Sequence, residues 1–134
     1  MARKGYNRLE SKHRAILCAA YALEKKAFDV RILEVQGLSS LTDYLLLASG
    51  RSDRQVQAVA ESVRLGLKKD HAILPLAVEG MNEGRWVLID YGDVMVHIFQ
   101  QPVREFYDLD GLWSEAAEIP VPDEYHWERQ AGAR

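Results

Sequence analysis

The chain has 134 residues, of which 48% are apolar, and carries a formal net charge of −3 at pH 7 with a pI near 5.8. This length and composition predict one folded domain with a sizeable core and argue against a disordered chain. The acidic balance argues against a generally basic nucleic-acid binder. Cys18 is the single cysteine, which excludes an intramolecular disulfide and fits a reducing compartment.

The two ends of the chain differ in charge. Residues 1–10 are polar and basic, and we expect a flexible arm that is either solvated or in contact with phosphates. Residues 115–134 form an acidic segment with two prolines, which we expect to be a tail. No apolar run approaches the roughly 18 residues of a membrane span, and no apolar segment of a secretory signal follows the N-terminus. We therefore expect a soluble cytoplasmic protein without a membrane association.

The first half of the chain predicts a helix, two strands and a second helix. Ser11 can cap a helix that runs to about Lys26, and residues 28–35 are typical of a strand. The continuous apolar run at residues 44–49 predicts a central strand that is covered on both faces. Ser52 to Gln55 matches a capping box, in which each side chain bonds the other residue's backbone N–H. A helical stripe follows it: Val56, Val59, Ala60, Val63 and Leu67.

The second half predicts three strands and a third helix. Residues 73–78 contain Pro75, which cannot donate to a strand ladder, so it marks either an edge strand or the start of a strand. Residues 85–100 predict a hairpin, and Pro102 suits the first turn of a helix that ends near Trp113. The order α-β-β-α-β-β-β-α favours a single α/β domain with a mixed sheet of about five strands flanked by helices.

The hairpin has two unlike faces because side chains alternate along a strand. With Tyr91 and Gly92 as the loop residues, Asp90 lies opposite Asp93, Leu88 opposite Met95 and Trp86 opposite His97. Aliphatic residues occupy one face, which we interpret as core. The other face carries a mixed set: Trp86, Leu88, Asp90, Asp93, Met95 and His97. Trp86 on that face is either core beneath a helix or an anchor of a protein interface, where tryptophan is enriched.

Other patterns point only weakly to chemistry. Asp90 and Asp93, paired across a turn, could perform acid–base work or bind a cation, but such residues more often bond their own turn. Residues 50–52 stand before a helix N-terminus, where anions bind readily, but they lack a P-loop or a GxGxxG motif. The four histidines lack the spacing of metal ligands, so we expect no metal and no cofactor.

Several long motifs together resemble the Iojap-related ribosomal silencing factor family. They are GLSSLTDYLLLASGRSDRQVQAVAESV at residues 37–63, LPLAVEG at residues 74–80, RWVLIDYGDVMVHIF at residues 85–99 and REFYDLDGLW at residues 104–113. The resemblance covers residues 12–114, so we expect a domain at residues 11–114. It implies a fold similar to that of nucleotidyltransferases without catalytic activity, since the acidic pair of those enzymes is missing.

The resemblance also implies a function. Members of that family bind the large ribosomal subunit through ribosomal protein L-fourteen and obstruct joining of the small subunit, which lowers translation when nutrients are short. The family's partner-binding tryptophan corresponds to Trp86. We therefore expect one partner-binding surface: Trp86, Leu88, Asp90, Tyr91, Gly92, Asp93, Met95 and His97. The basic N-terminal arm could add a minor rRNA contact.

Two other hypotheses remain at this point. A nucleotide-binding or nucleotidyltransferase-type enzyme would need a nucleotide at residues 50–52 and a metal at Asp90 and Asp93. A homodimer formed through the hairpin face would instead show a concentration-dependent mass in solution.

Overall fold

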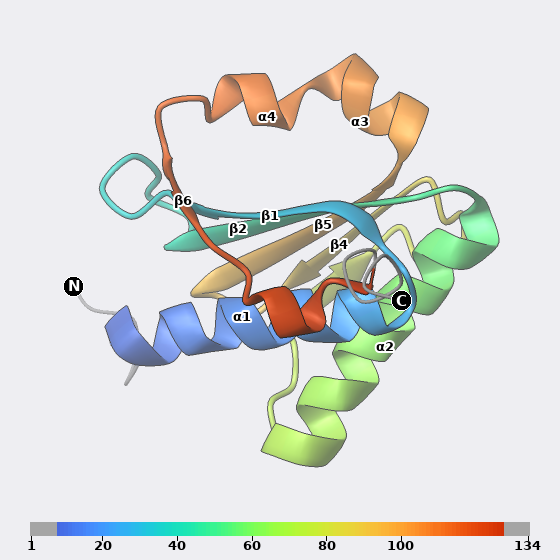
Figure 1. Ribbon diagram of the computed structural model, residues 1–134, viewed down its shortest axis with the longest axis horizontal. Helices are drawn as coiled ribbons and strands as arrows, with labels where there is room; N and C mark the ends of the chain where they lie inside the picture. The colour runs from blue at the N-terminus through green and yellow to red at the C-terminus, as the bar shows by residue number, and fades with distance from the viewer. Residues whose placement is uncertain (1–7, 128–134) are drawn as a thin grey trace.

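The computed structural model describes residues 8–127, which form a mixed sheet with helices on both faces (Figure 1). The elements in chain order are α1 (Arg8–Glu24), β1 (Phe28–Glu34), β2 (Tyr44–Gly50), α2 (Asp53–His71), β3 (Ala77–Glu79), β4 (Trp86–Asp90), β5 (Val94–Gln100), α3 (Gln101–Tyr107), α4 (Leu109–Leu112), β6 (Ala117–Ile119) and the 3₁₀ turn η1 (Asp123–Tyr125). The expected α/β class and the single mixed sheet are confirmed, whereas the likeness to nucleotidyltransferases stays a prediction.

The sheet has six strands in the order β3-β4-β5-β2-β1-β6, one more than expected. β2 and β5 are parallel, and every other neighbouring pair is antiparallel. All residues of β2 are buried, which confirms the central strand predicted from its continuous apolar run. β3 lies at the edge as predicted, but it begins after Pro75, because a proline has no N–H to give to the ladder.

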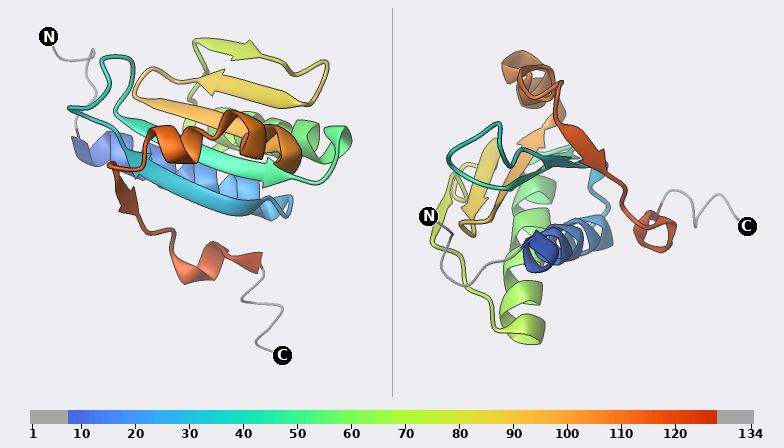
Figure 2. Two further views of the ribbon diagram at one scale, coloured as in Figure 1. Left: turned by 90° about the horizontal axis from the view of Figure 1, so that it is seen from above. Right: turned by 90° about the vertical axis from the view of Figure 1, so that its left-hand side faces the viewer.

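Helices cover the sheet unequally. α1 and α2 lie against one face, and the shorter α3 and α4 lie against the other (Figure 2). The larger apolar cluster lies under α1 and α2 and includes Ile32, Leu46, Val63 and Ile98. The smaller one lies under α3 and α4 and is centred on Leu33, Val35, Leu45, Leu47 and Phe99. The sheet face beneath α3 and α4 is therefore less completely covered.

Of the two long helices, α1 begins earlier than expected and α2 begins where expected. α1 starts at Arg8, so Ser11 is a buried residue within the helix and not its cap. α2 does begin at the predicted cap, since Ser52 Oγ accepts from the Gln55 N–H at 3.2 Å. The return bond differs: Gln55 Oε1 accepts from the Arg51 N–H at 2.6 Å, and its amide donates to the carbonyls of Lys25 and Lys26. Gln55 therefore ties the start of α2 to the end of α1.

The last part of the described chain packs on the domain and is not a free tail. β6 pairs antiparallel with β1, and the Trp127 indole donates to the Ala27 carbonyl at 2.9 Å. Of the arm expected at residues 1–10, residues 8–10 belong to α1, and residues 1–7, like residues 128–134, lie outside the described part of the chain. Within residues 8–127 no helix is long and apolar enough to cross a membrane.

Candidate functional site

The hairpin of β4 and β5 turns one residue later than predicted, which moves the partner of each β4 residue two positions along β5. Asp90 pairs with Met95, Leu88 with His97 and Trp86 with Phe99. The loop residues are Gly92 and Asp93, because the Tyr91 N–H bonds the Val94 carbonyl at 2.9 Å and Gly92 takes a φ of 88°. Glycine at the first loop position suits a type II′ turn. Because the partner moves by two positions, the residues within β4 and β5 keep their predicted faces, although each predicted cross-strand pairing was wrong.

Asp93 is the member of the expected surface that the structure moves to the other side. Its side chain is fully buried, and its Oδ2 accepts from Ser11 Oγ at 2.7 Å and from Arg14 at 3.1 Å, both on α1. Asp90 instead accepts from the Gly92 N–H at 2.8 Å, closing the turn. The two carboxylates are not paired, and no cluster of three or more His, Cys, Asp or Glu among residues 8–127 could hold a metal.

Tyr91 is also buried on the side of α1 and α2, with 2% of its surface exposed. Burial raises the pKa of its hydroxyl above the ordinary value. The structure thus brings five of the eight expected residues together on the side of α3, which are Trp86, Leu88, Asp90, Met95 and His97. All five are half-buried.

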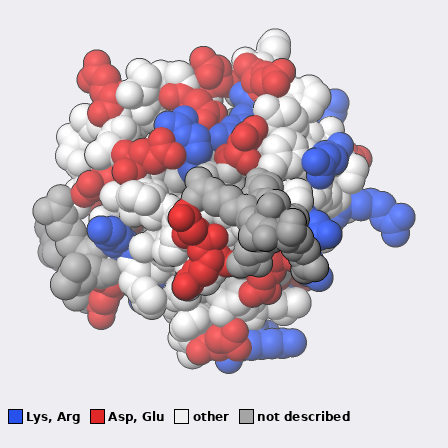
Figure 3. All heavy atoms as spheres, viewed as in Figure 1, with Lys and Arg blue, Asp and Glu red and all other residues white. Residues whose placement is uncertain are grey.

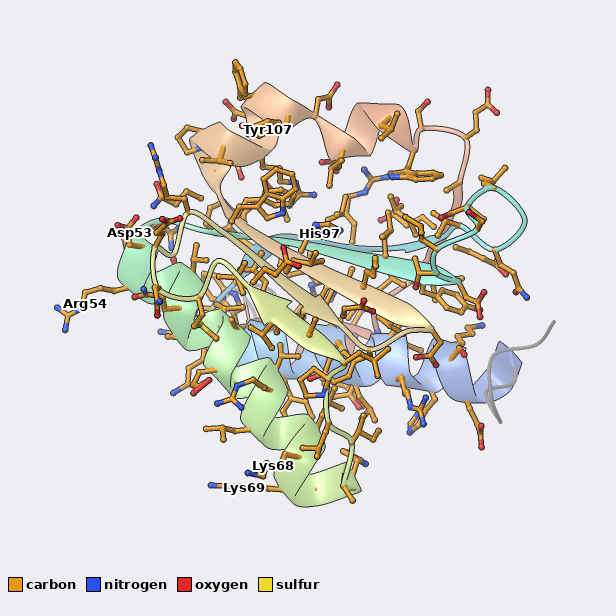
Figure 4. All side chains as sticks on the ribbon, turned by 180° about the vertical axis from the view of Figure 1, so that it is seen from behind. Asp53, Arg54, Lys68, Lys69, His97 and Tyr107 are labelled. Carbon is orange, nitrogen blue, oxygen red and sulfur yellow. The ribbon has the colours of Figure 1, made fainter. Side chains whose placement is uncertain are left out.

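Trp86 stands at the centre of an aromatic cluster. Its ring centroid lies 5.1 Å from that of Phe99, 5.9 Å from that of His97 and 4.9 Å from that of Tyr107 on α3. Figure 4 shows His97 and Tyr107 on the same side of the sheet. α3 therefore covers part of the Trp86 face: the ring packs beneath a helix, and one part of it borders a pocket, while its role as an interface anchor stays a prediction.

A pocket of about 360 Å³ opens beside the accessible part of Trp86. It is lined by Arg85, Trp86, Pro102, Val103, Phe106 and Tyr107. Phe106 is 80% exposed and Tyr107 54% exposed, so two aromatic side chains of α3 stand at its rim. The sequence analysis missed the α3 residues of this site, because nothing in the local pattern tells on which strand a short helix will dock. Phe99 could have been found, since it alternates with Met95 and His97.

His97 lies beside Trp86 on the same face. Burial lowers the pKa of its imidazole to about 4, so the ring is neutral near pH 7. Its Nδ1 accepts a hydrogen bond from the Trp86 Nε1–H at 3.0 Å. His97 Nδ1 is thus engaged within the chain, and the expected contact of His97 with a partner stays a prediction.

A buried arginine fixes α3 on the sheet. Arg104 is 5% exposed, and its guanidinium donates to both carboxylate oxygens of Asp110 at 2.9 and 2.8 Å. It also donates to Ser49 Oγ of β2 and to the Asp29 carbonyl of β1. Arg31 reaches the same carboxylate at 2.8 Å. The Arg104 and Arg31 bonds hold the pKa of Asp110 at about 2.

The candidate anion site before α2 is occupied by local contacts. The Ser52 hydroxyl oxygen accepts a hydrogen bond from the Gln55 N–H, and the Arg51 guanidinium lies 5.1 Å from the centroid of the Phe28 ring. On the side of the molecule seen in Figure 3, acidic side chains are widely spread, and Lys and Arg gather toward the right-hand edge.

Comparisons with known proteins agree with one another. The family described as "Ribosomal silencing factor during starvation" matches residues 8–134. The Bacillus subtilis (strain 168) protein "Ribosomal silencing factor RsfS" is 40% identical over 100 residues, which cover 75% of this chain and 84% of that protein. "Protein Iojap, chloroplastic" of Arabidopsis thaliana is 31% identical over 115 residues, which cover 86% of this chain and 48% of that protein. A crystal structure of a Chromobacterium violaceum protein matches with a TM-score of 0.75 at 33% identity. The match covers 88% of this chain and 98% of that protein.

Proposed function

Because this chain belongs to the ribosomal silencing factor family, we propose that it represses translation by binding the large ribosomal subunit at ribosomal protein L-fourteen. Bound there, it sterically blocks association with the small subunit. Family membership supports a translation-regulating role at the ribosome. The finer steps are our proposal, as are the absence of catalysis, a cytoplasmic location and the response to nutrient limitation.

The observation that carries the proposal is the aromatic pocket beside Trp86. Phe106 and Tyr107 expose most of their surface at its rim, and Trp86 forms part of its wall. Exposed aromatic groups around a partly buried tryptophan are typical of the anchor region of a protein interface. We therefore assign the partner contact to the open end of this face, where Leu88, Asp90 and Met95 extend it.

Occlusion requires only binding and no chemistry. The factor must occupy a surface on which the other subunit docks, and its affinity must compete with that docking. Tyr91 and Asp93 are buried beneath α1 and α2, so we omit them from the direct contacts. A minor rRNA contact by the N-terminal arm falls on residues outside the described part of the chain. A homodimer through the same face, formed off the ribosome, would compete with subunit binding.

Co-sedimentation with isolated large and small ribosomal subunits tests the proposal. We expect the wild-type chain to pellet with the large subunit alone, and Trp86→Ala to weaken its apparent affinity about thirtyfold, the loss that a hot-spot residue of about 2 kcal/mol gives. Trp127→Ala is the matched control, since its indole bonds the Ala27 carbonyl before β1, and β5 and β2 separate β1 from β4 in the sheet. This control should bind as the wild type does.

Two outcomes would contradict the proposal in different ways. Pelleting with neither subunit would remove the ribosomal role, and calorimetric titration with ATP and Mg²⁺ would then test the enzyme hypothesis. Equal large-subunit binding by the wild type and a folded Trp86→Ala variant would keep the partner but show that the assigned face is wrong.

A further inference from the structure

We infer that His97 is a positioning residue, which holds the Trp86 indole in place as a wall of the aromatic pocket and does not itself contact the partner. The inference deepens the proposed function and rests on it for the effect on binding. The hydrogen bond and its effect on Trp86 can be tested without a ribosome.

The register of the hairpin places the two residues within reach of each other. Trp86 lies opposite Phe99 and His97 lies opposite Leu88, so Trp86 and His97 are diagonal neighbours on one face. Long aromatic side chains span such diagonals in antiparallel sheets. The Trp86 Nε1–H and His97 Nδ1 are 3.0 Å apart, a normal distance for a hydrogen bond between two nitrogens.

The protonation state of His97 suits an acceptor. A neutral imidazole has one nitrogen that donates and one that accepts, and because Nδ1 accepts here, Nε2 carries the proton. Burial keeps the ring neutral by disfavouring its charged form, as the pKa of about 4 indicates. A cationic imidazole has a proton on both nitrogens and could not accept this bond. The Trp86 N–H is therefore satisfied from within the chain at neutral pH.

The surrounding rings limit the movement of both side chains. The His97 ring stacks on Phe99 with an interplanar angle of 12° and a centroid distance of 5.9 Å, which orients Nδ1. Phe99 and Tyr107 pack against the indole. These ring contacts confine Trp86 by shape, and the hydrogen bond to His97 fixes the direction of its N–H. Without an acceptor, a half-buried N–H would turn toward another partner or toward water.

Two substitutions separate the hydrogen bond from the packing. His97→Phe keeps an aromatic ring beside Phe99 but removes the acceptor. His97→Asn loses the ring but retains an acceptor, because its Oδ1 is attached at the same carbon as the histidine Nδ1. A structural role for the ring alone would make His97→Phe the milder change. A positioning role makes His97→Asn the milder change at Trp86.

The first readout is the indole N–H resonance in ¹⁵N-labelled full-length protein, assigned by its loss in Trp86→Phe. We expect the Trp86 indole proton to exchange slowly in the wild type and in His97→Asn, and at least tenfold faster in His97→Phe. The indole protons of Trp113 and Trp127 serve as internal controls and should not change. Equally slow exchange of the Trp86 proton in His97→Phe would overturn the inference.

The second readout is the affinity for the large subunit. We expect His97→Phe to bind about five- to tenfold more weakly, the effect of one hydrogen bond, and His97→Asn to restore most of that loss. Faster indole exchange with unchanged binding, while Trp86→Ala still binds weakly, would overturn the link between the bond and partner binding. If Trp86→Ala binds as the wild type does, the proposed face fails, and the indole signal alone decides whether His97 positions Trp86.

Discussion

Asp90 and Asp93 are separated by two residues in the chain, yet their side chains serve different parts of the fold. Asp90 closes the turn by accepting from the Gly92 N–H, and Asp93 is buried against α1. The bonds from Ser11 and Arg14 offset part of the cost of burying the Asp93 carboxylate, whereas water can replace part of the Asp90 bond. At the scale of one residue, the position of the turn decides which carboxylate the fold depends on.

Alanine substitutions of the two residues should therefore differ in cost. We expect Asp93→Ala to lower the free energy of unfolding by about 3 kcal/mol, because it removes a buried carboxylate that accepts from both Ser11 and Arg14. Asp90→Ala should cost about 1 kcal/mol or less, the value of one turn hydrogen bond. Urea unfolding followed by circular dichroism measures both. Equal losses for the two variants would contradict the register of the hairpin.

At the scale of elements, the position of α3 depends on Arg104 and Asp110 as well as on apolar contact. α3 spans seven residues and ends at Tyr107, because Asp108 has a φ of 51° and breaks the single helix that was expected from Pro102 to near Trp113. So short a helix has little intrinsic stability. Arg104 joins it to β1 and β2, and Asp110 at the start of α4 pairs with both Arg104 and Arg31. The position of the pocket beside Trp86 follows from these bonds.

Stability should consequently fall in acid as Asp110 is protonated. Its pKa is about 2 in the folded chain and near 3.8 ordinarily, so the unfolded chain binds the proton more readily. The contribution of Asp110 is complete above about pH 4 and is lost as the pH falls through 2. Because the group is partly exposed, we expect only about 1 kcal/mol.

Denaturant unfolding at pH 5 and at pH 2.5 measures this contribution, with Asp110→Asn as the reference. The variant should be less stable than the wild type at pH 5, and the difference should shrink at pH 2.5. A difference that stays constant or grows on acidification would contradict the assigned ion pairs.

At the scale of the whole molecule, the two edges of the sheet are protected in different ways. β3 is three residues long and exposed at one edge, and β6 covers β1 at the other. Arg31 bonds Glu118 of β6 at 2.9 Å, and Trp127 bonds the Ala27 carbonyl. The described part of the expected tail thus shields a strand that would otherwise offer unpaired backbone groups.

Truncation after Ser114 should test this role. We expect the shortened chain to unfold at a lower urea concentration and to associate more readily, because the β1 edge becomes free. The Trp86 indole resonance should not shift, since the aromatic cluster lies on β4, β5 and α3. Sedimentation velocity and urea unfolding measure the two effects. An unchanged unfolding midpoint would instead restore the domain boundary expected near residue 114.

Some features of this protein follow from sequence alone because they depend on neighbours in the chain. Alternation along a strand predicted which face Trp86, Leu88, Met95 and His97 share, and the continuous apolar run at residues 44–49 predicted the buried central strand. The cap at Ser52 was equally local. The family resemblance spans several motifs in order, and it predicted the family that the comparisons confirm.

Tertiary structure alone decided the features that depend on distant residues. Asp93 is bonded to Ser11, and Arg104 to Ser49 and Asp29, across many residues of intervening chain. No local pattern encodes such contacts, because the residues meet and stabilise the fold only after the sheet and helices have assembled. β6 was missed for the same reason, since three residues between turn formers become a strand only when β1 offers an edge. The aromatic pocket likewise exists only because α3 docks beside Trp86.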